Sequence, residues 1–326
     1  MPPISSFVGR FSFQNFKCFD YGTELRDAAH RFVSNDPTVV GVYCPIVANW
    51  CVDRVTTFDN VFNSLNFNEP LTNWNTSSAT SMYAMFAYAK TFNQPIEQFQ
   101  VSRVVNFNCM FFEAEAFDQS LLTWGTSSAI SMRAMFEYSS FSHPVNHFVV
   151  DNMQDFLLMF YGSRFNQPIP SWSTLSARMM ISMFCLSPFN QNISHFAVDK
   201  VTRLDGMFTY GAFNHDISNW NISSASTTYR MFYYASSFNQ NLGSWGPALA
   251  NGLQVNGMFD GTSCPYPYDP DLTAVPRGPL CHYCGDTSNP IPAPSSSPSS
   301  VTKVGFERAA LHGLKEIRKP NLRFVS

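Results

Sequence analysis

Charged residues are scarce in this chain of 326 residues, and their scarcity argues against several classes of function. They make up 13% of the chain, about half of the roughly 25% that soluble domains usually carry. The net charge is −3 and the repeats contain no basic stripe, so the electrostatic footprint of a nucleic-acid-binding protein is missing. No apolar run reaches the length of about 18 residues that a membrane-spanning helix needs, so we expect no membrane span.

Catalytic motifs are missing as well. The sequence has no G-x-S-x-G, no H-E-x-x-H and no phosphate loop, and its acidic residues do not recur as pairs. We therefore expect no catalytic residue, no cofactor and no metal site. A carbohydrate-active enzyme is the alternative from another class, and it would need two carboxylates that face one groove. The sequence also begins without the continuous apolar core of a secretory signal.

Aromatic residues, in contrast, are abundant, and they recur with a regular period. One Phe, mostly preceded by Met, returns every 24 to 27 residues from Phe62 to Phe259. A second Phe follows it, and Trp or Phe comes seven residues later, as in Phe67 and Trp74. Such a period over most of a chain predicts a solenoid or a closed array of stacked coils. The second Phe recurs as Phe92, Phe117, Phe141, Phe165, Phe189, Phe213 and Phe238.

Each copy of the repeat predicts one short helix and one short strand. Met82, Met85, Phe86 and Ala89 have the i, i+3, i+4, i+7 spacing of one helix face. Residues 91–96 and their equivalents predict the extended segment, with a short paired strand because Pro occupies its fifth position in four copies. Stacking the coils about 4.8 Å apart would place like residues on like.

The segments at the two ends of the repeats differ from them in composition. An amphipathic helix over 23–33 precedes the first coil, where a stacked array needs a cover for its apolar end. The division that we expect is an unassigned segment 1–22, a helical N-terminal cap 23–43, the repeats 44–261, a Cys/Pro-rich C-terminal cap 262–285, a flexible linker 286–300 and a basic amphipathic helical tail 301–326.

The repeated pattern MFxxAxxFNQxIxxW resembles the BspA-like leucine-rich-repeat surface proteins. Residues 85–96, 159–172 and 231–245 carry it most completely, and the resemblance covers roughly residues 44–261. It implies a leucine-rich-repeat-like, right-handed solenoid with one short parallel strand and one short helical turn per repeat. It also implies an extracellular or cell-surface binding protein with a role in cell adhesion. Because no secretory signal is visible, an intracellular repeat scaffold is the alternative.

A row of polar residues follows the second Phe of each copy and has two interpretations. It could form an internal ladder whose side chains bond backbone groups at a turn, or a polar strip that binds a ligand. We favour the ladder, since repeats need a device that satisfies their turning backbone. Together with the second Phe, this ladder would include Asn93, Asn166, Asn190, Asn214 and Asn239.

The cysteines gather at the ends of the array. If the protein is secreted, we expect a disulfide between Cys44 and Cys51, and another from Cys264 to Cys281 or Cys284. A zinc site made from the C-terminal cysteines and His282 is the weaker alternative, because it barely reaches four ligands. Three N-x-S sequons, at Asn75, Asn192 and Asn221, permit glycosylation.

The sequence favours a non-enzymatic interaction protein. A weakly charged repeat array offers a long surface to a protein or glycan ligand, and we expect a monomer. A structural wall or matrix component without a specific ligand is a further alternative. The sequence identifies neither the ligand nor the face that would bind it.

Overall fold

The computed structural model describes residues 16–282. The chain divides into two units, Met1–Ser288 and Asn289–Ser326, of which the second lies outside the described residues. The expected linker 286–300 and helical tail 301–326 therefore lie outside them too, as does most of the segment 1–22.

Two helices cover the first coil. Helix α1 spans Gly22–Val33, where the sequence predicts a helix, and α2 spans Pro37–Val42, which the sequence did not predict. Asp36 caps α2 by accepting the Thr38 backbone N–H at 2.9 Å, and Arg31 also contacts this carboxylate, at 2.8 Å. The Thr38 hydroxyl donates to the same carboxylate at 2.7 Å. The hydrogen bonds from the Thr38 hydroxyl, the Thr38 N–H and Arg31, in that order of effect, lower the pKa of Asp36 to about 2. Gly22 lies against the backbone of Thr57, where a side chain would collide with the carbonyl oxygen.

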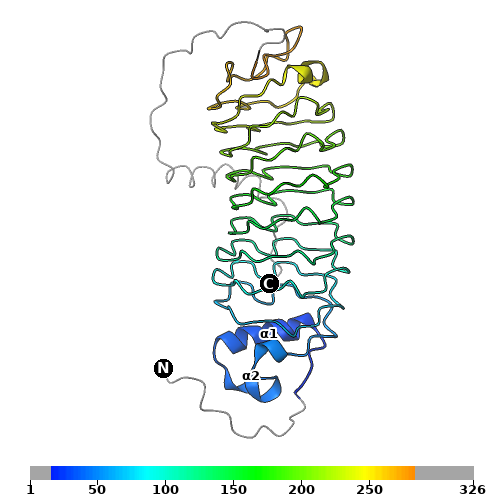
Figure 1. Ribbon diagram of the computed structural model, residues 1–326, viewed down its shortest axis with the longest axis vertical. Helices are drawn as coiled ribbons and strands as arrows, with labels where there is room; N and C mark the ends of the chain where they lie inside the picture. The colour runs from blue at the N-terminus through cyan, green and yellow to red at the C-terminus, as the bar shows by residue number, and fades with distance from the viewer. Residues whose placement is uncertain (1–15, 283–326) are drawn as a thin grey trace. The chain divides into compact units, whose positions relative to one another are not determined.

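After the short 3-10 helix η2 (Val47–Asn49), the chain runs as coils that lie on one another (Figure 1). Parallel bridges join residues one period apart, in one series from Thr57 to Ser131 and a second from Asp155 to Gln254. The sequence places the paired segment elsewhere, at residues 91–96 and their equivalents, but no described bridge falls there. The pairing lies instead just before each Met-Phe pair, and this corrects the expected position of the strand.

Six residues around each Met-Phe pair form successive turns, and we call these segments the turn hexapeptides. In the hexapeptide 83–88, the N–H groups of Ala84, Phe86 and Tyr88 donate to the next coil, whereas those of Met85 and Ala87 bond three residues back. The second and sixth residues of every hexapeptide have a positive φ, which no helix tolerates. The predicted short helix is therefore wrong. The hexapeptides are residues 83–88, 108–113, 133–138, 157–162, 181–186, 205–210, 229–234 and 256–261.

The core consists of two columns of Phe rings that run through the stacked coils. The Phe of each Met-Phe pair stacks on its equivalent, as Phe86 does on Phe111 at a centroid distance of 5.7 Å. The second Phe makes the other column, in which Phe92 lies 6.1 Å from both Phe67 and Phe117. The columns contact each other within each coil, at 4.0 Å between Phe86 and Phe92. Each buried ring contributes roughly 1.5–3 kcal/mol of hydrophobic stabilisation.

The C-terminal end of the stack is covered by an irregular segment. The 3-10 helix η3 spans Gly243–Ala248, and antiparallel bridges pair Tyr266 with Cys281 and Asp271 with Gly278. The Leu280 carbonyl accepts the backbone N–H of Leu242 in the last coil, at 3.2 Å. Leu280 and Cys281 are fully buried, so this segment closes the core that the last coil would otherwise expose.

Candidate binding face

The turn hexapeptides have an inner and an outer side. Their third and fourth residues are Met and Phe, which enter the core, as Met85 and Phe86 do. The other four positions supply a continuous outer surface, which we call the turn face. Leu157, Tyr161 and Ile181 of this face are buried and yet do not belong to the apolar core. The turn face is therefore a separate layer of side chains on the far side of the backbone.

Tyrosine is concentrated on the turn face. The chain has 13 Tyr, and all of those within the repeats 44–261 occupy the first, fifth or sixth position of a turn hexapeptide. Tyr88 and Tyr234 each expose 38% of their surface. Tyr is an enriched residue type in binding surfaces, because its ring gives a large contact area and its hydroxyl bonds polar groups. The tyrosines of the face are Tyr83, Tyr88, Tyr138, Tyr161, Tyr210, Tyr229, Tyr233 and Tyr234.

Aromatic rings of neighbouring coils contact each other edge to face across this surface. Tyr88 meets Phe112 at 5.0 Å, and Tyr138 meets Tyr161 at 5.1 Å. A Cβ atom on Gly162 would collide with the Tyr138 ring, 2.6 Å away, so the glycine makes room for that ring. The face is thus packed rather than a set of loose side chains, and its rings are held in place before any ligand arrives.

The last coils carry a cluster of tyrosines on the turn face. The Tyr210 ring lies 5.3 Å from Tyr234 and 5.7 Å from Tyr233. The Arg230 guanidinium carbon lies 4.6 Å from the centroid of the Tyr233 ring and 5.0 Å from that of Tyr229, within the range of cation–π attraction. This cluster combines flat apolar surface with a positioned cation.

The centre of the turn face holds the carboxyl group of Glu137 and the free thiols of Cys109 and Cys185. Glu137 is 1% exposed. Burial, and secondarily the charge of Glu137, raise the pKa of Cys109 to about 12. The same two causes raise the pKa of Cys185. Both thiols stay protonated at neutral pH and are therefore poor nucleophiles. The turn face can stack against a ligand and bond it, but these cysteines do not equip it for covalent chemistry.

The polar row forms a hydrogen-bonded ladder, as the sequence favoured, but the ladder is not internal, since Asn166, Asn190 and Asn239 are exposed. The Asn68 side-chain oxygen accepts the Asn93 backbone N–H at 2.8 Å, and the same bond links Asn166, Asn190, Asn214 and Asn239 at 2.9 Å per step. The next residue of each coil reaches back too, as Gln94 does to the Asn68 carbonyl at 3.0 Å. The side chains of this row therefore form hydrogen bonds with backbone N–H and carbonyl groups of the neighbouring coil.

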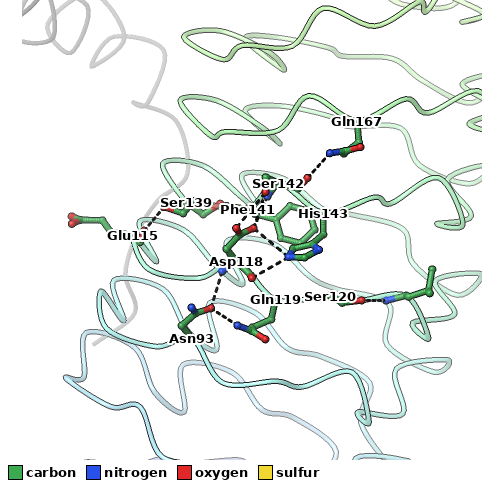
Figure 2. A network of polar contacts seen from close by, with 12 residues as sticks. Asn93, Glu115, Asp118, Gln119, Ser120, Ser139, Phe141, Ser142, His143 and Gln167 are labelled. Carbon is green, nitrogen blue, oxygen red and sulfur yellow. Dashed lines mark hydrogen bonds and ion pairs between the residues drawn. The ribbon is translucent and has the colours of Figure 1, made fainter.

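Two departures from the Asn-Gln pattern keep the ladder bonded. Asp118 accepts the Ser142 backbone N–H at 2.9 Å, and the His143 ring nitrogen lies 3.1 Å from the Asp118 carbonyl oxygen (Figure 2). Gln167 then donates to the Ser142 carbonyl at 2.9 Å. At the last step, the His282 ring nitrogen lies 2.9 Å from the Asn239 side-chain oxygen, so the C-terminal cap continues the ladder.

In a third row, the position seven residues after the second Phe is Trp in some coils and Phe in others, and the two kinds of coil make an equivalent hydrogen bond with different side chains. The Trp124 indole N–H donates to the Ile96 carbonyl of the preceding coil at 3.2 Å. Where Phe replaces Trp, the residue before it makes the equivalent contact, as His147 does to the Leu121 carbonyl at 2.9 Å. The sequence carried a signal for this substitution. Gln or His stands before each Phe of the row, at Gln98, His147 and His195, and nowhere before its Trp residues.

The disulfides differ from the expected pairs at one end. Cys51 bonds to Cys18 at 2.14 Å, so the predicted bond to Cys44 is wrong and Cys44 is free. Sequence proximity suggested the wrong partner, because the segment before α1 runs back alongside Cys51, and the Phe19 N–H donates to the Cys51 carbonyl. At the other end Cys264 bonds to Cys281, one of the two partners left open, and Cys284 lies outside the described residues.

Within residues 16–282, no group of three or more His, Cys, Asp or Glu side chains could hold a metal ion. Over the same residues, no helix is both long enough and apolar enough to cross a bilayer. The sequon residues Asn75, Asn192 and Asn221 are all exposed, and each side-chain oxygen accepts the backbone N–H of the Ser two residues on.

Comparison with known proteins gives one match. A family model described as Mycoplasma protein of unknown function, DUF285, matches residues 42–148, 115–188 and 165–265. These overlapping segments fit a repeat protein and together span 42–265, more than half of the 326 residues. No curated protein and no solved structure matches the chain.

Proposed function

The chain belongs to the family described as Mycoplasma protein of unknown function, DUF285, and from this premise we propose that its coils present the turn face to a protein or glycan ligand without catalysing a reaction. The observation that carries the proposal is that every tyrosine of the repeats lies on that one face. The core does not require tyrosine there, because the Phe columns lie on the other side of the backbone.

We further propose that the coils form a leucine-rich-repeat-like, right-handed solenoid of the BspA-like kind. The parallel bridges at a spacing of one period and the stacked Phe rings support this assignment. In such a solenoid the turn face would be its regular, hydrogen-bonded side, on which the four outer positions of each hexapeptide are free to vary. An extended surface of this kind suits recognition of a large ligand.

We propose an extracellular or cell-surface location. The two disulfides, Cys18–Cys51 and Cys264–Cys281, support it because such bonds persist in oxidising compartments. Both fasten an end of the array, where a small irregular cap has little core of its own. Mass spectrometry of the protein from its native source, with and without reductant, tests the location through the state of these four thiols.

The binding role is tested by comparing two triple variants of the full chain. One replaces Tyr88, Tyr138 and Tyr234 on the turn face with Ala. The matched control replaces Leu122, Ile130 and Leu175, apolar side chains that are 59–63% exposed and lie outside the turn face. Both are applied to one panel of immobilised extracellular-matrix proteins and glycans, after circular dichroism has shown that each is folded.

We expect the wild type and the control to bind the same members of the panel and the tyrosine variant to lose them. Loss in the control with retention in the tyrosine variant would place the binding surface elsewhere. A wild type that binds no member of the panel, but that fractionates with the cell wall, would favour the structural-component alternative.

A further inference from the structure

A groove opens at the surface between the coil that contains Phe99 and the coil that follows it. Its volume is about 670 Å³, and it is lined by residues 95, 97–102, 123 and 125. None of these residues belongs to a turn hexapeptide, so the groove is separate from the turn face. We call it the Glu97 groove, after the charged side chain of its lining.

Two departures from the repeat coincide in this groove. Glu97 lies two residues before the Phe of its coil, and its equivalents in the other repeats are not acidic. Gly125 follows Trp124, and a Cβ built on it would meet no heavy atom within 4 Å, so the space beside it is open. At Gly246, the equivalent glycine of the last coil, the Arg277 carbonyl oxygen lies 2.9 Å from the Cβ position and occupies that space. The equivalents of Glu97 are Thr72, Leu122, Asn146, Pro170, Ser194, Ser218 and Gly243.

The hydrogen-bond donors of the groove are directed at carbonyl groups of the protein. The Gln98 amide donates to the Leu71 carbonyl at 3.1 Å, and the Gln100 amide donates to the Gln98 carbonyl at 2.8 Å. The Thr123 hydroxyl donates to the Glu97 carbonyl. The lining therefore offers a ligand mainly acceptors, namely the Glu97 carboxylate, the Gln98 side-chain oxygen and the lone pairs of the Thr123 hydroxyl.

The groove carries a negative charge without a cation in its lining. Glu97 is half-buried, and its Oε1 atom accepts the Ser120 hydroxyl at 3.2 Å. Among the described residues, no ion pair involves Glu97, and no Lys, Arg or His lines the groove. Because a partly desolvated charge interacts more strongly than one in bulk water, the groove attracts a cation and repels an anion.

We infer that the Glu97 groove binds an alkylammonium group, the cation that lysine side chains and free polyamines carry. An ammonium has three donors and no acceptor, which matches the acceptors of the lining. Its methylene stem would lie against the apolar lining residues Pro95, Phe99 and Val101. A guanidinium would need both carboxylate oxygens for its paired bonds, and Ser120 already bonds to one of them. This inference goes beyond the proposed function, because the groove lies outside the turn face.

The test is ligand-observed NMR titration of the full chain with two amines, N-acetyl-lysine methylamide and diaminopentane. N-acetyl-norleucine methylamide, which has a similar stem but no charge, is the comparison ligand. Glu97→Gln removes the charge and keeps an acceptor for Ser120. Gly125→Val fills the open space, and Val149 stands at the equivalent position of the following coil, so the backbone accepts this residue. The matched control is Glu69→Gln, the same change at an exposed carboxylate outside the groove.

At least one amine should bind the wild type with a Kd of about 1 mM, and the norleucine compound should not bind. The affinity should fall about tenfold in Glu97→Gln and about fivefold in Gly125→Val, and by less than about twofold in the control. Binding of the lysine compound would assign the groove to a protein partner, and binding of diaminopentane alone would assign it to a free amine, and both outcomes support the site.

The inference is wrong if neither amine binds the wild type, or if Glu97→Gln binds as tightly as the wild type does. Equal binding of the norleucine compound would also overturn it, because the charge would then play no part. None of these results bears on the turn face, whose role is tested by its own tyrosine variant.

Discussion

On the inner side, the third and fourth residues are Met and Phe in all eight of the turn hexapeptides, from Met85-Phe86 to Met258-Phe259. On the outer side, the fifth residue is Ala87, Phe112, Glu137, Tyr161, Cys185, Thr209, Tyr233 or Asp260. These neighbouring positions belong to one backbone segment, with the same φ pattern in every coil. The backbone is therefore held by the inner residues and by the bonds between coils, and the outer residues are free to vary from coil to coil.

The largest expected effect tests the inner side against the outer side within a single hexapeptide. Phe86 is fully buried in the stack of rings, and Phe86→Ala should lower the free energy of unfolding by about 3–5 kcal/mol. Tyr88, two residues on, is partly exposed, and Tyr88→Ala should cost about 1 kcal/mol or less through the lost Phe112 contact. Chemical denaturation of both variants measures the difference, and equal losses would contradict the division into two sides.

The next effect concerns the ends, where a coil has a neighbour on one side only. Replacing Cys264 and Cys281 with Ser opens a disulfide that closes 17 residues of the C-terminal cap. We expect a loss of about 3 kcal/mol, measured as a lower Tm. Cys109→Ala, on the turn face and without a disulfide, is the control and should change the Tm little. A Tm that is unaffected by the double Ser variant would show that the cap is held by packing alone.

A smaller effect tests whether the alternating Trp and His-Phe coils are equivalent. His147→Ala leaves the Leu121 carbonyl without its side-chain partner, and we expect a cost of about 1–3 kcal/mol. Adding Phe148→Trp to this variant restores an indole donor of the kind that Trp124 supplies, and it should recover most of the loss. Asn219→Ala, which removes an exposed bond to the Ser194 carbonyl, is the control and should cost less. Failure of the second change to restore stability would show that the two coil types are not interchangeable.

The sequence predicted the residues of the interior better than the conformation of the backbone. Phe86 and Phe92 recur at fixed spacing, and this spacing alone identifies them as core. The helical spacing of Met82, Met85, Phe86 and Ala89 was misleading, because every second N–H group of this segment bonds to the next coil instead of four residues back. Ala84 and Tyr88 have a positive φ, and neither residue type indicates a left-handed backbone in a sequence, as Gly does.

The turn face was harder to predict than the core. Without the turn conformation, Tyr83 and Tyr88 have no assigned side, and the tyrosines of different coils look scattered. The contact between Arg230 and Tyr233 is close in sequence, but Gly257 and Asp260, which lie beside these two residues, come from the following coil. Likewise, Cys51 has Cys44 as its nearer cysteine, and only the path of the chain before α1 brings Cys18 to it. Features that depend on the register between segments were therefore not available from one copy of the repeat.

The smallest effect sharpens the comparison through Asp260, the fifth residue of the last turn hexapeptide. Burial, and then the neighbouring charge of Asp269, raise the pKa of Asp260 above its ordinary value of 3.8. A carboxyl whose pKa is raised in the folded state makes the fold less stable wherever it is ionised, and this penalty disappears as the pH falls below the ordinary pKa. Asp260→Asn should therefore raise the Tm slightly at neutral pH and have no such effect near pH 3.

Because Asp260 is exposed, solvent screens this penalty and the gain in Tm should be small. A residue kept for its ligand at some cost to the fold shows this pattern, and a residue kept for packing does not. A lower Tm for Asp260→Asn at neutral pH, measured against the wild type by calorimetry, would place Asp260 among the structural residues and erase the distinction between the two sides at this coil.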